Sequence, residues 1–342
     1  MTTRRGFVLG GTMIVDHVKI VKTYPQEGTL APILRTSRGL GGCPVNNALN
    51  LRAVDPDLPI AVTGRVGDDE NGQYILKTLQ ANQIDVSAVV VSTTAPTSQT
   101  DVITVRGTGQ RTFFHHQGAN AEWGVEDIPF EQFAGFQIAQ IGYILLLDGM
   151  DALDPDYGTV MARAFASFQQ MGLKTAVDVV SEASDRFARL VTPTLRYVDY
   201  LILNEFEAGQ TVGMTLRDAT GRLRGERLRE VAEKLLLAGN SSLVVIHMPE
   251  GGYALSRAGE ECKVPSFLLT EADIQGTVGA GDAFCSGVLY GLEQAWSLED
   301  ALQLGSTLAA CSLFSPTATG GILPLEDARR KMRPYPLRPL VF

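Results

Sequence analysis

The pattern of apolar positions is clearest in the second half of the chain. Runs of Val, Ile and Leu that have no polar face predict buried strands at 138–147, 174–180, 198–203 and 243–248. Between these runs the apolar spacing follows the period of a helix, which predicts helices at 157–172, 205–212 and 226–239. Strands that are apolar on both faces and alternate with helices indicate a parallel sheet covered by helices on both sides.

The first half of the chain combines this pattern with exposed β-structure. Strands are predicted at 7–15 and 60–66, and a helix is predicted at 70–82. The segments 17–38 and 95–118 instead carry short β-prone pieces separated by Gly and Pro, with no helical spacing. We expect these two segments to form a small sheet that lies beside the main domain as a lid.

Two helices and a proline-rich tail complete the predicted fold. The helices, at 280–295 and 298–313, are rich in Ala, Gly, Ser and Leu, which suits close packing. Three prolines between 334 and 342 favour an extended strap. The sequence contains no internal repeat and no low-complexity linker. We therefore expect a single α/β domain over residues 1–342, with a mostly parallel central sheet and the small β-sheet lid.

Composition and charge narrow the class of protein. The 342 residues carry a net charge of −9, and the pI is near 5.1. An acidic surface argues against nucleic acid or an anionic membrane as a partner, because both attract basic faces. No apolar run is long enough to cross a bilayer. The cysteines Cys43, Cys262, Cys285 and Cys311 are far apart, which suits free thiols in a reducing cytoplasm, so we expect a cytoplasmic protein.

The strongest chemical signal is a loop of small residues, Gly276 to Asp282, that leads into an apolar helix. Backbone N–H groups of Gly279, Ala280 and Gly281 can point at one anion, and the positive end of the helix adds to their effect. A carboxylate beside an anion site is unfavourable unless it takes a proton from an attacking hydroxyl. Asp282 is therefore predicted to be a general base beside a cradle for a transferring phosphoryl group.

This loop is one of several motifs that occur in a fixed order. Together they closely resemble the ribokinase-like (PfkB) family of carbohydrate kinases, over nearly the whole chain. The motifs are Gly-Thr-Met-Ile-Val-Asp16-His17, Gly41-Gly42-Cys-Pro-Val-Asn46-Asn-Ala, Gly64-Arg-Val-Gly-Asp-Asp69, Gly118-Ala-Asn120, Asn204-Glu-Phe-Glu207 and Gly279-Ala-Gly-Asp282.

The resemblance implies a three-layer α/β/α fold and assigns roles to the motif residues. It implies that Asp282 deprotonates the acceptor hydroxyl while Gly279, Ala280 and Gly281 form the anion hole. It also implies a sugar site, made of Asp16, Gly41, Gly42 and Asn46. These residue types suit the task, because a carboxylate accepts two hydroxyl hydrogen bonds, an amide both donates and accepts, and Gly exposes its backbone to a polar ligand.

The resemblance further implies ATP and Mg²⁺ as cofactors. Asn204 and Glu207 of the NxxE motif would order the magnesium ion and the phosphates through water, with Glu207 as the residue nearest the metal. His247 and Gly252 occupy the stretch that corresponds to the family's nucleotide loop, and Thr277 lies in the anion-hole motif. We therefore expect the ATP site at these five residues.

Three departures from the family pattern limit the prediction. Ile14 replaces an Asn that contacts sugar in ribokinase, and Cys43 replaces a Lys in the glycine loop. Gly276 replaces the acid that opens the family's D-T-x-G-A-G-D motif, which argues against the family's monovalent-cation (K⁺) site. Phosphoryl transfer is compatible with these changes, whereas ribose specificity is not expected.

The predicted function is therefore an ATP-dependent kinase of a small sugar, with ribose or fructose as the default acceptor. A nucleoside kinase of the same fold is an alternative, because Phe113, Phe114 and Trp123 could stack on a base. A sugar-sensing protein without catalytic activity is a second alternative, although a pure binder needs no base. The resemblance also suggests a homodimer through the lid.

Four further polar residues stay without an assigned role. His115 and His116 are adjacent in a predicted strand and so should face opposite sides, which disfavours a shared metal ion and leaves one of them facing the sugar. Asp148 and Asp178 lie at the carboxyl ends of predicted strands, where open α/β sheets bind ligands.

Overall fold

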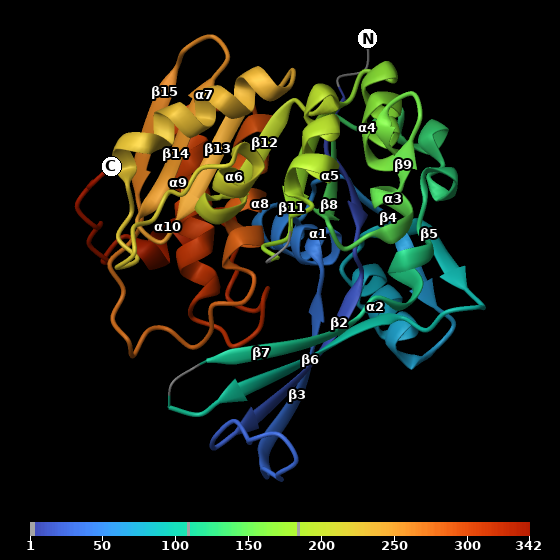
Figure 1. Cartoon of the computed structure of the whole chain (residues 1–342), viewed down its shortest axis with the longest axis vertical. Coiled ribbons are helices and arrows are strands. Elements are labelled where there is room, and N and C mark those ends of the chain that lie inside the picture. The colour runs from blue at the N-terminus through green and yellow to red at the C-terminus, as the bar shows by residue number, and fades with distance from the viewer. Residues whose placement is uncertain (1–3, 108–109, 183–184) are drawn as a thin grey trace.

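The computed structural model describes residues 4–107, 110–182 and 185–342. Its main body is built on a large sheet, and a smaller four-stranded sheet projects from one edge of that body (Figure 1). This arrangement confirms the predicted α/β fold with a lid.

The large sheet is parallel except at one edge. Its strands occur in the order β15-β14-β13-β12-β11-β8-β1-β4-β5, and only β14 and β15 are antiparallel to their neighbours. Their bounds are β1 Phe7–Gly11, β4 Ile60–Gly67, β5 Asp85–Ser92, β8 Ile138–Ile144, β11 Lys174–Val179, β12 Tyr200–Asn204, β13 Leu243–Met248, β14 Gly251–Ser256 and β15 Glu261–Pro265.

Helices cover both faces of this sheet. Neighbouring strand residues pack into different cores, as Phe7 and Val8 do, which explains why the strands have no polar face. One face carries α3 Asp148–Asp151, α4 Val160–Gln170, α5 Phe187–Thr194, α6 Glu205–Val212 and α7 Leu228–Ala238. The other face carries α1 Cys43–Val54, α2 Glu70–Ala81, α8 Ala280–Glu293, α9 Leu298–Ser312 and α10 Leu325–Met332.

The lid consists of four strands in the order β3-β2-β6-β7. Their bounds are β2 Ile14–Val21, β3 Ile33–Gly41, β6 Ser98–Val105 and β7 Arg111–His116. These strands overlap the segments 17–38 and 95–118, but β2 begins at Ile14 and β3 ends at Gly41. A single residue, Gly42, separates β3 of the lid from α1 of the main body.

Several predicted boundaries differ from the structure. The apolar run 7–15 was predicted as one strand, but it is divided between β1 of the main sheet and β2 of the lid. The break lies at Gly11, whose φ is 128° and whose position leaves no room for a side chain, because an added Cβ would lie 1.7 Å from the carbonyl oxygen of Gly142. The sequence pattern did not predict the edge strands β14 and β15 or the helices α5 and α10.

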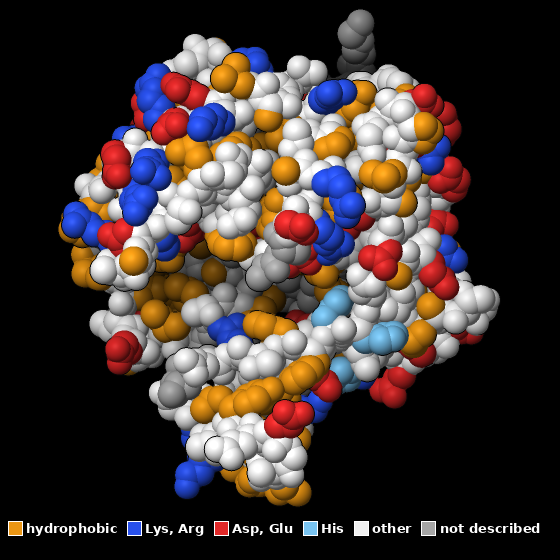
Figure 2. All heavy atoms as spheres, viewed as in Figure 1, with side chains coloured by type: hydrophobic (Ala, Val, Ile, Leu, Met, Phe, Trp, Pro, Cys, Tyr) orange, Lys and Arg blue, Asp and Glu red, His pale blue; other side chains and the backbone are white. Residues whose placement is uncertain are grey.

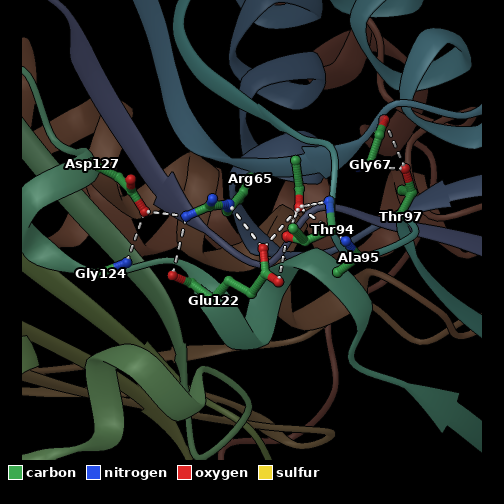
Figure 3. A network of polar contacts seen from close by, with 9 residues as sticks. Arg65, Gly67, Thr94, Ala95, Thr97, Glu122, Gly124 and Asp127 are labelled. Atoms are coloured by element: carbon green, nitrogen blue, oxygen red, sulfur yellow. Dashed lines mark hydrogen bonds and ion pairs between the residues drawn. The ribbon is translucent and has the colours of Figure 1, made fainter.

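A polar network fixes the root of the lid (Figure 3). Arg65, near the end of β4, forms ion pairs with Glu122 and Asp127. Thr97, just before β6, accepts a hydrogen bond from the backbone N–H of Gly67 at 2.9 Å and donates one to Asp69 at 2.6 Å. The Gly64-Arg-Val-Gly-Asp-Asp69 motif therefore anchors the lid to the main body.

Two further predictions concern membranes and thiols. Among the described residues, no helix combines the length and the apolar character needed to span a bilayer. Cys43, Cys262, Cys285 and Cys311 form no disulfide bond, as predicted from their spacing.

Candidate active site

Asp282 lies in the first turn of α8 at the base of a cavity between the main body and the lid. The side chain is buried, with 6% of its surface exposed. Asn46 Nδ2 donates to Asp282 Oδ2 at 2.8 Å, and the Tyr143 hydroxyl donates to Oδ1 at 2.8 Å. Burial raises the pKa of Asp282 to about 6, and these two hydrogen bonds oppose the rise. The carboxylate is thus held in place and can accept a proton near neutral pH.

The backbone before Asp282 has the geometry of an anion cradle. Gly279 is the N-cap of α8 in the left-handed conformation, with φ 79°, and an added Cβ would lie 2.6 Å from Ala318 Cβ. Ala280 and Gly281 follow in the first turn, where backbone N–H groups have no acceptor within the helix. Both residues line the cavity, so their N–H groups and the positive end of the helix are available to an anion.

Two of the predicted sugar-site residues, Asn46 and Asp16, lie near Asp282, and Gly41 and Gly42 lie beside Asp16 and Thr12. Asn46, on α1, bonds to the carboxylate directly, and its Oδ1 is buried without a hydrogen-bond partner. Asp16, on β2, is close enough for the charge of Asp282 to contribute to its raised pKa of about 6, although burial is the larger cause. An added Cβ at Gly41 would lie 2.7 Å from Asp16 Oδ2, and one at Gly42 would lie 1.9 Å from the backbone oxygen of Thr12. Both glycines therefore allow a close approach at this site.

A polar row crosses the lid beside Asp16. Thr100 is the register partner of Asp16 on one side and of His115 on the other. Its hydroxyl is bonded to the Asp16 carboxylate, and Thr100 Oγ1 lies 3.0 Å from His115 Nδ1. Because an ionised carboxylate only accepts, Thr100 donates to Asp16 and His115 Nδ1–H donates to Thr100. His115 therefore belongs to the same face as Asp16, whereas His116 pairs with Gln99 and faces the other side.

The NxxE residues form the opposite wall of the cavity. Asn204 caps α6, and its side-chain oxygen accepts from the N–H of Glu207 at 2.9 Å. Glu207 Oε1 accepts from Ser181 Oγ and from Asn204 Nδ2, both at 2.7 Å, and Oε2 accepts from the backbone N–H of Asn204 at 3.0 Å. Burial raises the pKa of Glu207 to about 7. Both carboxylate oxygens already have protein donors, so a cation here would meet Glu207 through water.

Two adjoining cavities lie along this wall, and Figure 2 shows the hollow between the lid and the main body. The cavity that contains Asp282 has a volume of about 400 Å³, and its neighbour has a volume of about 490 Å³. They share Asn204, His247, Thr277, Ala280 and Gly281. An acceptor and a nucleotide could therefore meet at the start of α8.

The second cavity contains most of the predicted nucleotide residues. His247 stacks on Phe284 with ring centroids 5.1 Å apart, and burial lowers its pKa to about 4, so the ring is neutral. Gly252 does not line either cavity among the described residues. It lies in β14 opposite His247, and an added Cβ would lie 2.8 Å from Phe284 Cζ. The structure thus places Gly252 against α8, while Gly251 lines the second cavity.

Some cavity residues were not assigned from the sequence. Tyr143 lies 139 residues from Asp282 in the chain and reaches it from the carboxyl end of β8. Asp178, at the end of β11, lines the same cavity, and burial together with the charge of Asp282 raises its pKa well above the ordinary value. Cys43 Sγ and carboxylate oxygens of Asp178 and Asp282 all lie within 4.8 Å of one another.

Asp148 is exposed and accepts a hydrogen bond from Gln117 at 3.1 Å, away from the cavity lining.

We expect the Tyr143→Phe variant to change the pH dependence of turnover. The tyrosine hydroxyl stabilises the charged form of Asp282, so its loss raises the pKa of that carboxylate further. A hydrogen bond to a charged group contributes roughly 1.5–3 kcal/mol, which corresponds to about one to two pKa units. The acidic limb of kcat should therefore move upward by about that amount, with turnover near pH 9 almost unchanged. An unshifted limb would show that Tyr143 does not tune the base.

Comparisons with known proteins identify the family of the chain. Residues 7–324 match the pfkB family carbohydrate kinase domain. A 5-dehydro-2-deoxygluconokinase of Bacillus velezensis is 24% identical over 334 residues, which is 94% of this chain and 94% of the relative. A 5-dehydro-2-deoxygluconokinase of Clostridium perfringens is 23% identical over 285 residues, covering 81% of this chain and 78% of the relative.

Solved structures show the same fold. A ribokinase of Arabidopsis thaliana complexed with ribose and ATP has a TM-score of 0.78 at 17% identity, over 97% of this chain and 99% of that one. A ribokinase of Thermotoga maritima has a TM-score of 0.78 at 18% identity, over 96% and 99% of the two chains. The family match shows that this fold belongs here to a carbohydrate kinase. The chain belongs to the pfkB family of carbohydrate kinases, which are phosphotransferases with an alcohol group as acceptor.

Proposed function

We propose that this carbohydrate kinase transfers the γ-phosphoryl group of ATP to a hydroxyl of a small sugar or sugar acid, with Asp282 as the general base. The observation that carries the proposal is the position of Asp282. Its buried carboxylate lies in the first turn of α8, directly after the residues whose N–H groups can hold a phosphoryl group. A carboxylate with a pKa near 6 is ionised at neutral pH and can still accept a proton.

The acceptor is expected to lie between α1 and the lid. The unpartnered Oδ1 of Asn46 is an acceptor for a sugar hydroxyl, and the Asp16 carboxylate accepts from others. His115 uses Nδ1 to bond Thr100, which leaves Nε2 as an acceptor that faces the same side of the lid. A site that offers several hydrogen-bond acceptors favours a ligand that carries several hydroxyl groups.

ATP is expected in the second cavity, with its phosphates toward the start of α8. His247 and Thr277 line both cavities and would flank the nucleotide. The oxygen donors of Glu207, Asn204 and Asp178 fit Mg²⁺, which prefers oxygen ligands and retains water. When bound, Mg²⁺ supplies positive charge to the phosphate oxygens.

The transfer step follows from this arrangement. The acceptor oxygen forms a bond to the γ-phosphorus while the bond from that phosphorus to the β–γ bridging oxygen breaks. The hydroxyl proton moves to Asp282 Oδ, and ADP leaves with the electron pair of the broken bond. The N–H groups of Gly279, Ala280 and Gly281 bind the equatorial oxygens of the transferring group.

The names of the relatives direct the choice of acceptor. The relatives from B. velezensis and C. perfringens are called 5-dehydro-2-deoxygluconokinase, so 5-dehydro-2-deoxygluconate is the first acceptor to test. Ribose and fructose follow, since sugar kinases of this fold include the ribokinase complexed with ribose. A nucleoside acceptor stays an alternative: Trp123 is fully buried in the core and cannot stack on a base, but Phe113 is exposed and lines the cavity of Asp282.

The experiment that tests the proposal is a measurement of ADP release. Purified protein is incubated with ATP and Mg²⁺ against a panel of sugars, sugar acids, polyols and nucleosides, with Asp282→Asn in parallel. We expect at least one carbohydrate to give ADP release that the variant loses. Turnover that needs no carbohydrate, or that persists in the variant, would contradict the proposed mechanism. The absence of ADP release with every compound of the panel would contradict the proposed acceptor class.

A further inference from the structure

Arg111 is the one arginine or lysine among the described residues that line the cavity of Asp282. It begins β7, on the same face of the lid as Phe113 and His115, because alternate strand residues share a face. Its guanidinium donates from Nη2 to the hydroxyl of Thr277, on the far side of the cavity. The lid and the anion-hole loop are thus joined across the site by a cation.

This guanidinium has no carboxylate partner among the described residues. Two other lid cations are paired, since Lys19 forms an ion pair with Asp101 and Arg38 forms one with Glu70. Arg111 is half-buried and uses one donor on a neutral hydroxyl, although a guanidinium carries five N–H donors. Burying a charged group without a partner costs free energy, and an anion that binds beside the group offsets this cost.

The position of Arg111 identifies which anion that is. Thr277 stands two residues before Gly279, so the guanidinium lies at the cradle end of the cavity. His115, in the polar row with Asp16, is four residues along β7, which is roughly 13 Å at the usual rise of a strand. The lid therefore presents hydroxyl-binding groups at one end and its cation at the other, where the phosphoryl group passes.

We propose that Arg111 is a catalytic residue that the lid contributes to phosphoryl transfer, where it donates hydrogen bonds to the γ-phosphoryl oxygens on the side opposite the backbone cradle. The inference rests on the proposed function. Arg111 neither gains nor loses a proton. It stabilises the charge on the phosphoryl oxygens as the acceptor oxygen binds the γ-phosphorus and the bond to the ADP oxygen breaks. Because the guanidinium belongs to the lid, the site is complete only when the lid lies over the acceptor.

The test compares two lid arginines. Arg111→Met removes the charge and keeps most of the side-chain length, and Arg111→Lys keeps the charge without the planar fork. Arg106→Met is the matched control, because Arg106 is exposed at the end of β6 and does not line the cavity. Thermal unfolding of each variant shows whether it folds. Kinetic constants are measured with Mg·ATP and the carbohydrate of the panel that gives the highest kcat/KM.

We expect kcat of Arg111→Met to fall about 10- to 100-fold, as for the loss of one charge-assisted contact, with KM for the acceptor changed less than threefold. Arg111→Lys should recover part of the loss, and Arg106→Met should match the wild type. A second measurement uses ADP and Mg²⁺ with and without aluminium fluoride, which mimics the transferring phosphoryl group. The wild type should bind ADP more tightly with aluminium fluoride, and Arg111→Met should lose this gain while binding ADP alone normally.

Two outcomes would overturn the inference. A kcat of Arg111→Met within threefold of the wild type would show that the guanidinium does not act in the transfer. A rise in KM that is confined to acidic acceptors, with neutral acceptors unaffected, would show that Arg111 binds a substrate carboxylate instead. Both differ from failure of the proposed function, in which the wild type itself releases no ADP with any acceptor.

Discussion

Replacing Asp282 with Asn should lower kcat at least a hundredfold and leave the affinity for the acceptor nearly unchanged. The expected loss follows from the role of the carboxylate, because a positioned general base typically contributes about 10²–10⁴-fold. The amide keeps the shape of the side chain at the start of α8 but cannot take the hydroxyl proton. The measurement is kcat and KM from ADP release, together with acceptor binding by calorimetry.

Asp148→Asn is the matched control for this variant. Asp148 is exposed, accepts a hydrogen bond from Gln117 and is not among the described residues that line the cavity. The turnover of Asp148→Asn should therefore equal that of the wild type. Near-wild-type turnover of Asp282→Asn would remove Asp282 from the role of base. A fall in acceptor affinity equal to the fall in kcat would make it a binding group instead.

The stability of Asp282→Asn offers an independent check of the buried charge. The pKa of Asp282 is raised from 3.8 to about 6 in the folded protein, so the folded state holds this proton at a higher pH than the unfolded state. The carboxylate therefore opposes folding above about pH 6, and this effect disappears as the pH falls towards 4. The Tm of the variant relative to the wild type should accordingly decrease as the pH is lowered from 8 to 5.

Gly279→Ala should lower kcat by about 10²–10³-fold, as expected for the loss of one donor of an oxyanion-type site. Gly279 has φ 79°, a conformation that costs an L-residue roughly 1–2 kcal/mol. The new Cβ would also lie 2.6 Å from the Cβ and from the backbone oxygen of Ala318, so the loop must move. A shifted loop misaligns the N–H groups of the cradle, and we expect the loss in kcat rather than in acceptor KM.

Gly213→Ala is the matched control, because it has the backbone strain of a positive φ without the steric clash that Gly279→Ala has. Gly213 ends α6 with φ 70°, and an added Cβ would meet no atom within 4 Å. It should lose stability by a similar conformational cost but keep its turnover. If the kcat of Gly279→Ala is within tenfold of the kcat of Gly213→Ala, the cradle does not depend on Gly279.

The sequence predicted the elements whose side chains interact with near neighbours. The apolar runs of β8, β11, β12 and β13 were recognisable because each is buried on both faces. Gly279 and Asp282 could be proposed as cradle and base from the sequence, because a cradle needs small residues and a base within one short loop. In both cases the physical requirement, burial of a strand on both faces or small residues beside an acid, can be read from residues that are close together in the sequence.

Features that depend on distant contacts were not predictable in this way. Nothing in the apolar run 7–15 shows that Gly11 must pass close to Gly142, so the division between β1 and β2 was missed. Tyr143 looks like any residue of a buried strand until α8 brings Asp282 within 2.8 Å of its hydroxyl. Trp123 was considered for base stacking because exposure cannot be inferred from residue type, yet the structure buries it completely.

The single residue between β3 and α1 determines how this protein can be recombined with its relatives. Gly42 has φ 91°, and an added Cβ would lie 1.9 Å from the backbone oxygen of Thr12, so no other residue fits there without rearrangement. A chimera that exchanges the lid cannot have its boundary at this position, because the lid strand and the helix that carries Asn46 are one continuous piece. The exchanged segment must therefore include α1 and, with it, Asn46.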